Sequence, residues 1–157
     1  MVNPLEETFP GLVRGGYVIT SPRTKGYNCI AWAAGATGNW WWPVPEADET
    51  FWPSGVARAE TPAAFRDAFA SLGYVECSGE DREPGFEKIA LFANDQGVPL
   101  HAARQLPEGR WTSKLGELED IEHALHDLEG TLYGAVVLVM KRPVPSPAGV
   151  ATERKDG

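Results

Sequence analysis

The sequence predicts a single α+β domain in which two helices precede a mostly antiparallel sheet. Its 157 residues are close to the length of one domain. The hydrophobic fraction of 43%, with 6 Trp, 6 Phe and 4 Tyr, provides enough bulky side chains for a core. Turn signals recur closely in the second half of the chain, which is typical of strands joined by hairpins.

The N-terminal part is expected to contain a lead-in followed by a short buried helix. Residues 1–22 are rich in Pro and Gly and predict mostly loop, with one strand-like run from Tyr17 to Thr20. The run from Asn28 to Gly35 predicts a helix, because Asn is a favoured N-cap and Gly a favoured stop. Cys29 then falls in the first helical turn.

Residues 39–53 contain several tryptophans and prolines without a helical or alternating period, so we expect an ordered aromatic loop. Trp40, Trp41, Trp42 and Trp52 are candidate substrate-binding residues, because dense aromatic side chains can line a cleft for a peptide or glycan. The same side chains could equally cover the core, and the sequence leaves both interpretations open.

A second helix and a series of strands follow the aromatic loop. Thr61 and Pro62 are an N-cap and a first-turn proline, and Gly73 ends the helical pattern. Strands are expected at 74–77, 88–93, 100–106 and 110–114, with turns at 94–97 and 107–109. The last three of these strands therefore form an antiparallel meander.

The C-terminal third predicts one more helix and one more strand. Apolar residues at helical spacing between 118 and 128 indicate a helix that ends at Gly130, and 133–141 forms a final apolar strand. The proline-rich and charged end is expected to be disordered. The domain organisation is then a lead-in at 1–22, a single α+β domain at 23–142 and a disordered tail at 143–157.

Charge and hydropathy exclude several classes of partner. With 14 basic and 22 acidic residues the net charge is −8, which disfavours nucleic acid as a partner. The longest apolar run, 135–140, is too short for a membrane helix, and residues 1–10 lack the features of a signal peptide. We expect a cytoplasmic protein that needs no cofactor and no membrane, although specialised export and the oligomeric state stay open.

Cys29 and His101 are the candidate catalytic pair. A thiol in the first turn of a helix is favoured as thiolate, because free backbone N–H groups and the helix dipole stabilise negative charge. His101 begins a strand and could carry the proton to the leaving group. If 107–109 is the turn, residue numbers of cross-strand partners sum to 216, which places Leu115 opposite His101 and Ser113 one diagonal step away.

Ser113 is therefore the expected orienter of the imidazole, with Lys114, Gln105 and Asp120 as alternatives if the register slips. The backbone N–H of Cys29 is the expected oxyanion donor. The Asn28 amide is a second candidate for contact with substrate, although capping the helix would occupy it.

Each candidate also has a purely structural interpretation. Cys29 could be a small buried hydrophobe and His101 a core histidine. His123 and His126 are spaced for at most two metal ligands, so a solvated helix face is expected there and no metal site. Cys77 is expected to be structural.

The motifs YNCIAWA (27–33), HAARQL (101–106) and WTSKLG (111–116) carry a resemblance. They resemble a family of small bacterial proteins defined as a domain of unknown function, over about residues 10–141. More distantly, a cysteine that begins a helix, followed by a histidine on a strand, is similar to the papain-like cysteine hydrolases, including the NlpC/P60, CHAP and transglutaminase-like groups.

The resemblance implies a papain-like (NlpC/P60-like) fold, with an N-terminal nucleophile helix packed on a mostly antiparallel sheet. It also implies a Cys–His dyad with a polar third residue, at Cys29, His101 and Ser113. Papain-type enzymes have Asn or Asp as orienter and a Gln upstream of the nucleophile, where this chain has Ser113 and Arg23.

The expected function is that of a cysteine hydrolase acting on an amide or thioester bond of a peptide, protein or glycopeptide. Peptidase, amidase and deamidase activities share this chemistry. The alternative from another class is a non-catalytic module that binds a peptide, protein or glycan through the tryptophan-rich loop. A metal-dependent site at His123 and His126 is a third and weaker hypothesis.

Overall fold

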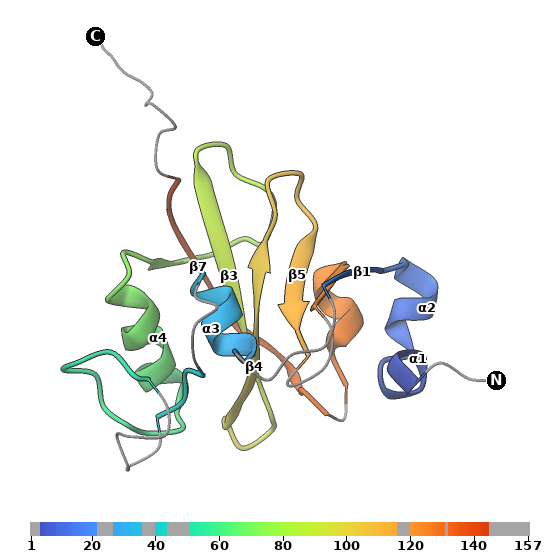
Figure 1. Ribbon diagram of the computed structural model, residues 1–157. Helices are drawn as coiled ribbons and strands as arrows, with labels where there is room; N and C mark the ends of the chain where they lie inside the picture. Colours follow the sequence, from blue (N-terminus) through green and yellow to red (C-terminus); the bar gives the residue numbers. More distant parts are fainter. Residues whose placement is uncertain are drawn as a thin grey trace, which may run out of the picture.

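One seven-stranded sheet dominates the computed structural model, shown in Figure 1. The structure describes residues 4–21, 27–35, 40–43, 51–115, 120–130 and 132–144. The strand order is β1-β6-β5-β4-β3-β7-β2, and every neighbouring pair is antiparallel. The strands are β1 (Val18–Ser21), β2 (Val75–Cys77), β3 (Phe86–Ala93), β4 (Pro99–Gln105), β5 (Trp111–Lys114), β6 (Asp120–His123) and β7 (Ala135–Pro143).

The helices of the described residues are few and short. They are α1 (Pro4–Thr8), α2 (Gly11–Gly15), α3 (Cys29–Ala33), α4 (Pro62–Ala70) and the 3₁₀ helix η1 (Leu125–Leu128). The predicted papain-like α+β fold is therefore wrong. The molecule is mostly antiparallel sheet, and the helix that begins at Cys29 has 5 residues, too short to be the nucleophile helix expected of that fold.

Local signals predicted two helix starts correctly. The Asn28 side chain accepts a hydrogen bond from the Ala31 N–H at 3.1 Å, and the Thr61 side chain accepts one from the Ala64 N–H at 3.1 Å. These caps satisfy donors that the first turn of a helix otherwise leaves free. Pro62 stands at the first position of α4, where its missing N–H costs nothing.

The predicted meander and its register are also confirmed. β3, β4 and β5 are consecutive in the sheet, and the β4–β5 pairs are Arg104 with Thr112 and Gln105 with Trp111. Both pairs sum to 216, as the turn at 107–109 required. Hairpin geometry alone fixed this register.

Three segments differ from the expectation. Residues 120–128, expected within one helix, form β6 and η1, because β6 pairs with β5 on one side and β1 on the other. The lead-in contains α1 and α2 where loop was expected, and β1 extends to Ser21. The expected disordered tail begins within β7, which ends at Pro143, and its residues beyond Val144 lie outside the described residues.

Two hydrophobic clusters cover opposite faces of the sheet. Ile89 and Leu91 of β3 belong to a cluster with residues of α3 and α4, which we call the α3 face. The alternate residues Ala90 and Phe92 belong to a second cluster with residues of α2 and η1, which we call the η1 face. Within the described part of the chain, no helix has the length and apolar character needed to cross a membrane.

Candidate functional site

Cys29 is the first residue of α3 and is 7% exposed. Burial raises the pKa of its thiol to about 11. The backbone N–H of Ala102, which donates toward the sulfur, and the charge of Lys114 both lower this pKa and oppose the effect of burial. Desolvation is the largest of these effects, so it outweighs the helix-start position that the sequence suggested. The resting group is a neutral thiol.

The Asn28 amide bonds both to the first turn of α3 and to the segment at Trp41. Its oxygen accepts from the Ala31 N–H and from the Trp41 N–H at 3.0 Å, and its nitrogen donates to the Trp41 carbonyl at 2.8 Å. Asn28 therefore fixes α3 against the segment at Trp41, and these bonds use one of its two amide N–H groups.

His101, Ser113 and His123 form a continuous hydrogen-bonded chain on the η1 face. The Ser113 hydroxyl lies 2.9 Å from Nε2 of His101 and 2.7 Å from Nε2 of His123. Nδ1 of His123 lies 2.7 Å from the Ala124 carbonyl. All three side chains have 0% exposure. Strands β4, β5 and β6 each contribute one member.

The carbonyl at the end of this chain determines where the protons are. Because a carbonyl only accepts, His123 carries its proton on Nδ1, and its Nε2 then accepts from the Ser113 hydroxyl. The Ser113 oxygen in turn accepts from Nε2–H of His101. Nδ1 of His101 is left as a buried lone pair without a hydrogen-bond partner among the described residues.

Burial keeps both imidazoles neutral. Desolvation lowers the pKa of His101 well below its ordinary value, and a charge on His123 would lower it further. Desolvation also lowers the pKa of His123 to about 4; the bond to the Ala124 carbonyl opposes this shift and the charge of Arg110 adds to it. A neutral His101 with a free lone pair is in the protonation state that a general base requires.

Cys29 contacts the strand that carries His101, but the two side chains lie on opposite faces of the sheet. The thiol receives the N–H of Ala102, the residue that follows His101, from the α3 face. The His101 ring instead packs on the η1 face, where it stacks on Tyr133 at 4.0 Å between ring centroids. Burial raises the pKa of Tyr133, and the charge of Cys29 would raise it further.

The alternative orienters lie elsewhere. Lys114 and Asp120 are buried partners across β5 and β6, and an Asp120 carboxylate oxygen accepts the Tyr27 hydroxyl at 2.7 Å. The Gln105 amide donates to the Glu80 carbonyl at 2.9 Å. Of the four candidates named from the sequence, Ser113 is the one that contacts His101.

The described tryptophans of the aromatic loop pack mainly on the core. Trp41 and Trp52 are 7% and 3% exposed and belong to the α3-face cluster. Trp42 meets the Phe65 ring edge-on at 5.3 Å, and Trp40 is half-buried. This arrangement favours the core-covering interpretation for Trp41 and Trp52.

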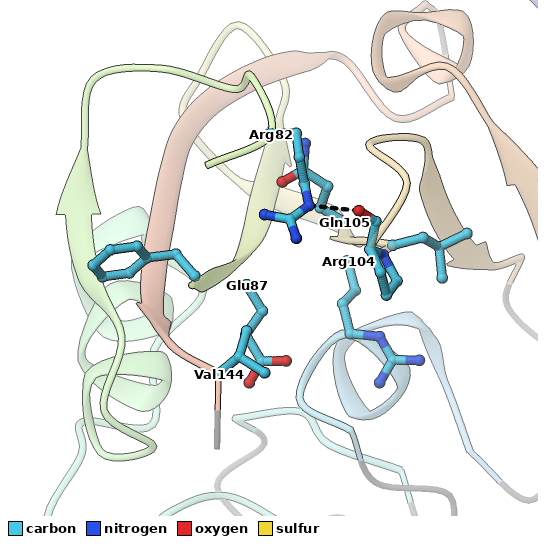
Figure 2. A pocket seen from close by; sticks show the side chains of 8 residues that line it. Arg82, Glu87, Arg104, Gln105 and Val144 are labelled. Carbon is cyan, nitrogen blue, oxygen red and sulfur yellow. Dashed lines mark hydrogen bonds between the residues drawn. The ribbon is translucent and has the colours of Figure 1, made fainter. Parts of the chain in front are cut away.

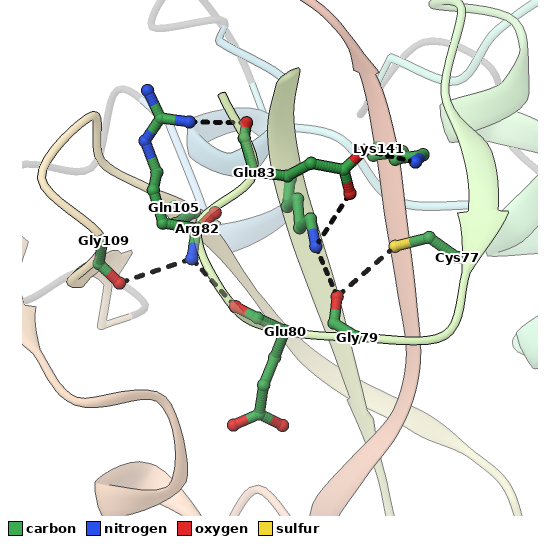
Figure 3. A network of polar contacts seen from close by, with 9 residues as sticks. Cys77, Gly79, Glu80, Arg82, Glu83, Gln105, Gly109 and Lys141 are labelled. Atoms are coloured by element: carbon green, nitrogen blue, oxygen red, sulfur yellow. Dashed lines mark hydrogen bonds and ion pairs between the residues drawn. The ribbon is translucent and has the colours of Figure 1, made fainter. Parts of the chain in front are cut away.

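The remaining histidine and cysteine lie apart from this site. His126 is exposed and contacts Glu80 at 2.8 Å and Glu129 at 2.9 Å. Among the described residues, no group of three His, Cys, Asp or Glu side chains is arranged to hold a metal ion. The Cys77 thiol is a free, partly buried group that contacts the Gly79 carbonyl at 3.6 Å (Figure 3).

Sequence reasoning missed His123 and Tyr133. His123 was expected on a solvated helix face, and it is completely buried on β6. The alternation of Ile121 and His123 on one side of a short strand was the available signal. Tyr133 was read only as the start of a strand.

Comparison with known proteins identifies a family for most of the chain. A family model described as a domain of unknown function (DUF7689) matches residues 18–141. The chain belongs to this family. The match spans α3 and all seven strands except the last residues of β7, so it contains Cys29 and the whole His101–Ser113–His123 chain. No curated protein and no solved structure matches the sequence.

Proposed function

We propose that this DUF7689 protein is a cysteine hydrolase that acts on an amide or thioester bond, with Cys29 as nucleophile and His101 as general base. The observation that carries the proposal is the state of His101. Ser113 holds its Nε2–H, and its Nδ1 is a free lone pair one residue from the backbone group that contacts the thiol.

The surroundings of Cys29 support its role as the attacking group. The Ala102 N–H and the charge of Lys114 both favour the thiolate once the sulfur loses its proton. Lys114 has 0% exposure, so its charge acts through a weakly screening interior.

The reaction begins from neutral partners. As the Cys29 sulfur bonds to the acyl carbon, the thiol proton passes to Nδ1 of His101, and the positive charge is shared along the hydrogen bond to Ser113. The carbon–nitrogen or carbon–sulfur bond then breaks, and the leaving group takes the proton from Nδ1. Water, deprotonated by the same nitrogen, then attacks the acyl carbon. The carbon–sulfur bond to Cys29 breaks, the acid leaves, and the proton on Nδ1 returns to the sulfur.

The two groups must approach one another for this transfer. In the resting structure the thiol pKa is about 11 and that of His101 lies well below its usual range, so a stable thiolate–imidazolium pair is not expected. The proposal therefore requires that the two groups, which face opposite sides of the sheet in the resting structure, come within hydrogen-bond distance when substrate binds.

Acylation by p-nitrophenyl acetate tests the proposal without a known substrate. Intact-protein and peptide mass spectrometry would show acetyl transfer to Cys29, and release of p-nitrophenolate would give its rate. We expect loss of the burst in Cys29→Ser and His101→Gln, and a slower burst in Ser113→Ala. Cys77→Ser is the matched control, because Cys77 is the other free thiol and should leave the burst unchanged.

Acetylation of Cys77 alone, or equal acylation of Cys29 in folded His101→Gln, would overturn the proposal. Circular dichroism checks that each variant is folded. The burial of Cys29 and the neutral imidazoles favour a second candidate, a non-catalytic binding module built on the same sheet. An unreactive Cys29 in the native protein, with normal reactivity after unfolding, is the result expected of that module.

A further inference from the structure

We propose that a hollow beside the start of β3 and the end of β4 binds an organic monocarboxylate. Arg104 and Arg82 would bind the carboxylate, and apolar side chains would contact its hydrocarbon part. This site shares no residue with the Cys29 site, and the proposal does not depend on the hydrolase function. The hollow has a volume of about 270 Å³, which suits a small ligand. Its lining is Arg82, Phe86, Glu87, Arg104, Gln105, Leu106, Pro107 and Val144.

Arg104 has a charge that no carboxylate in the described residues compensates. It lies on the α3 face, where its guanidinium stacks over the Trp32 ring at 4.8 Å. The nearest acidic side chain by register is Glu87 on β3, a diagonal neighbour on the same face. Glu87 is already bound to Arg142 of β7, at 2.6 Å.

The three strands therefore present a row of Arg142, Glu87 and Arg104 with one positive charge in excess. Figure 2 shows Glu87 and Arg104 reaching from neighbouring strands into the same region, with Arg82 above them. The chain as a whole has a net charge of −8, so this local excess runs against the overall balance. A half-buried guanidinium with free donors is suited to a carboxylate, which it binds through paired hydrogen bonds.

Arg82 is held in position before any ligand arrives. Its Nε donates to the Pro107 carbonyl and its Nη1 to the Glu83 carbonyl, each at 2.5 Å, and its Nη2 makes no hydrogen bond to a described residue. Figure 3 shows that hydrogen bonds join the loop that carries Arg82 to the neighbouring strands. Lys88 of β3 donates to the Gly79 carbonyl at 2.6 Å, and Gln105 of β4 donates to the Glu80 carbonyl at 2.9 Å.

The other half of the lining is apolar, and it selects the class of anion. Phe86, Leu106, Pro107 and Val144 contribute hydrocarbon surface, with Val144 46% exposed. Inorganic phosphate would bind the guanidinium groups and leave the apolar surface exposed to water. A carboxylate with a short aliphatic chain uses both parts, and each buried methylene group adds roughly fourfold in affinity.

Titration of the full-length protein with hexanoate, acetate and inorganic phosphate at one ionic strength tests the proposal. Amide chemical shifts in ¹⁵N–¹H spectra would report the binding position and affinity. We expect shifts around Arg82, Glu87 and Val144, with hexanoate bound at least tenfold more tightly than acetate or phosphate. Arg104→Gln and Arg82→Gln should each weaken hexanoate binding about tenfold.

The matched control is Arg66→Gln, which removes the same charge from α4, at a residue that does not line the hollow. It should leave the affinity unchanged, as should Cys29→Ala, which separates this proposal from the hydrolase. Arg104→Lys, which keeps the charge and loses the paired donors, should recover only part of the affinity. Equal weakening in Arg66→Gln, phosphate binding as tight as hexanoate, or no shifts at these residues would overturn the proposal.

Discussion

Replacing Ser113 with alanine removes the centre of the buried hydrogen-bonded chain. Among the described residues the hydroxyl is the link between His101 and His123, at 2.9 and 2.7 Å, and the three side chains are fully buried. Because the position is fully buried, solvent does not replace the lost hydroxyl in Ser113→Ala. The His101 imidazole then keeps an unpaired N–H and the His123 imidazole an unpaired lone pair.

The expected cost follows from these two buried groups. Leaving a buried polar group unsatisfied costs about 1–3 kcal/mol, so two such groups predict a loss of roughly 3 kcal/mol in the free energy of unfolding. Tautomer exchange in His101 can recover part of one penalty, because its Nδ1 is free. For a chain of this size the loss corresponds to a fall of about 6–12 °C in melting temperature.

Urea denaturation followed by tryptophan fluorescence would measure the change. Thr112→Val is a suitable control on the same strand, because it removes one hydrogen bond, between the Thr112 hydroxyl and Trp32 Nε1–H at 3.1 Å. That variant should lose about 1 kcal/mol. If Ser113→Ala costs no more than Thr112→Val, the continuous chain does not exist in solution and the tautomer assignment fails with it.

Three further predictions concern pH, the helix cap and a close backbone contact. The folded-state pKa values of His101 and His123 are depressed, so the unfolded chain binds more protons and the free energy of unfolding should fall as pH drops below about 6.5. His123 alone, with a pKa of about 4, predicts a loss of about 3 kcal/mol by pH 4, measured by denaturation at a series of pH values. His123→Phe should flatten this pH dependence. Asn28→Ala removes three buried hydrogen bonds and should lower the free energy of unfolding by about 2–3 kcal/mol in urea, whereas a loss below 1 kcal/mol would contradict the capping geometry. Gly134 has φ of +75° and its added Cβ would collide with the Ala93 carbonyl, so Gly134→Ala should cost more than about 3 kcal/mol by thermal melting; a variant as stable as wild type would exclude this close approach.

The parts of the fold that sequence predicts well are those set by local chemistry. The caps at Asn28 and Thr61 depend on a side chain and the next three residues, and the β4–β5 register depends on a three-residue turn. The contact of Ser113 with His101 follows from that register. These features needed no knowledge of distant parts of the chain.

The failures come from pairing between distant segments. Ile121, Leu125 and Leu128 have helical spacing, yet residues 120–123 pair with β5, and residues 120–122 also pair with β1, which lies about a hundred positions earlier. Tertiary pairing overrides a short helical pattern in this way because each new ladder satisfies backbone groups and buries side chains together. The fold class was wrong for the same reason, since the sheet takes in segments that were read as helix or loop.

The consequence for the site is larger than one misplaced element. A helix at 118–128 would have placed His123 in solvent, and Ser113 would then have been the end of the polar chain. As a strand beside β5, the segment instead places the neutral His123 imidazole against Ser113. The Ser113 hydroxyl then donates its proton to His123 and accepts from His101. The free Nδ1 of His101, on which the proposed chemistry depends, is therefore set by a carbonyl of Ala124 three groups away.

Replacing His123 with Gln would test this control. Its amide can present either a donor or an acceptor to Ser113, so the protonation of His101 would no longer be fixed, and the acylation rate of Cys29 should fall while the fold persists. An unchanged rate would place the control of His101 elsewhere.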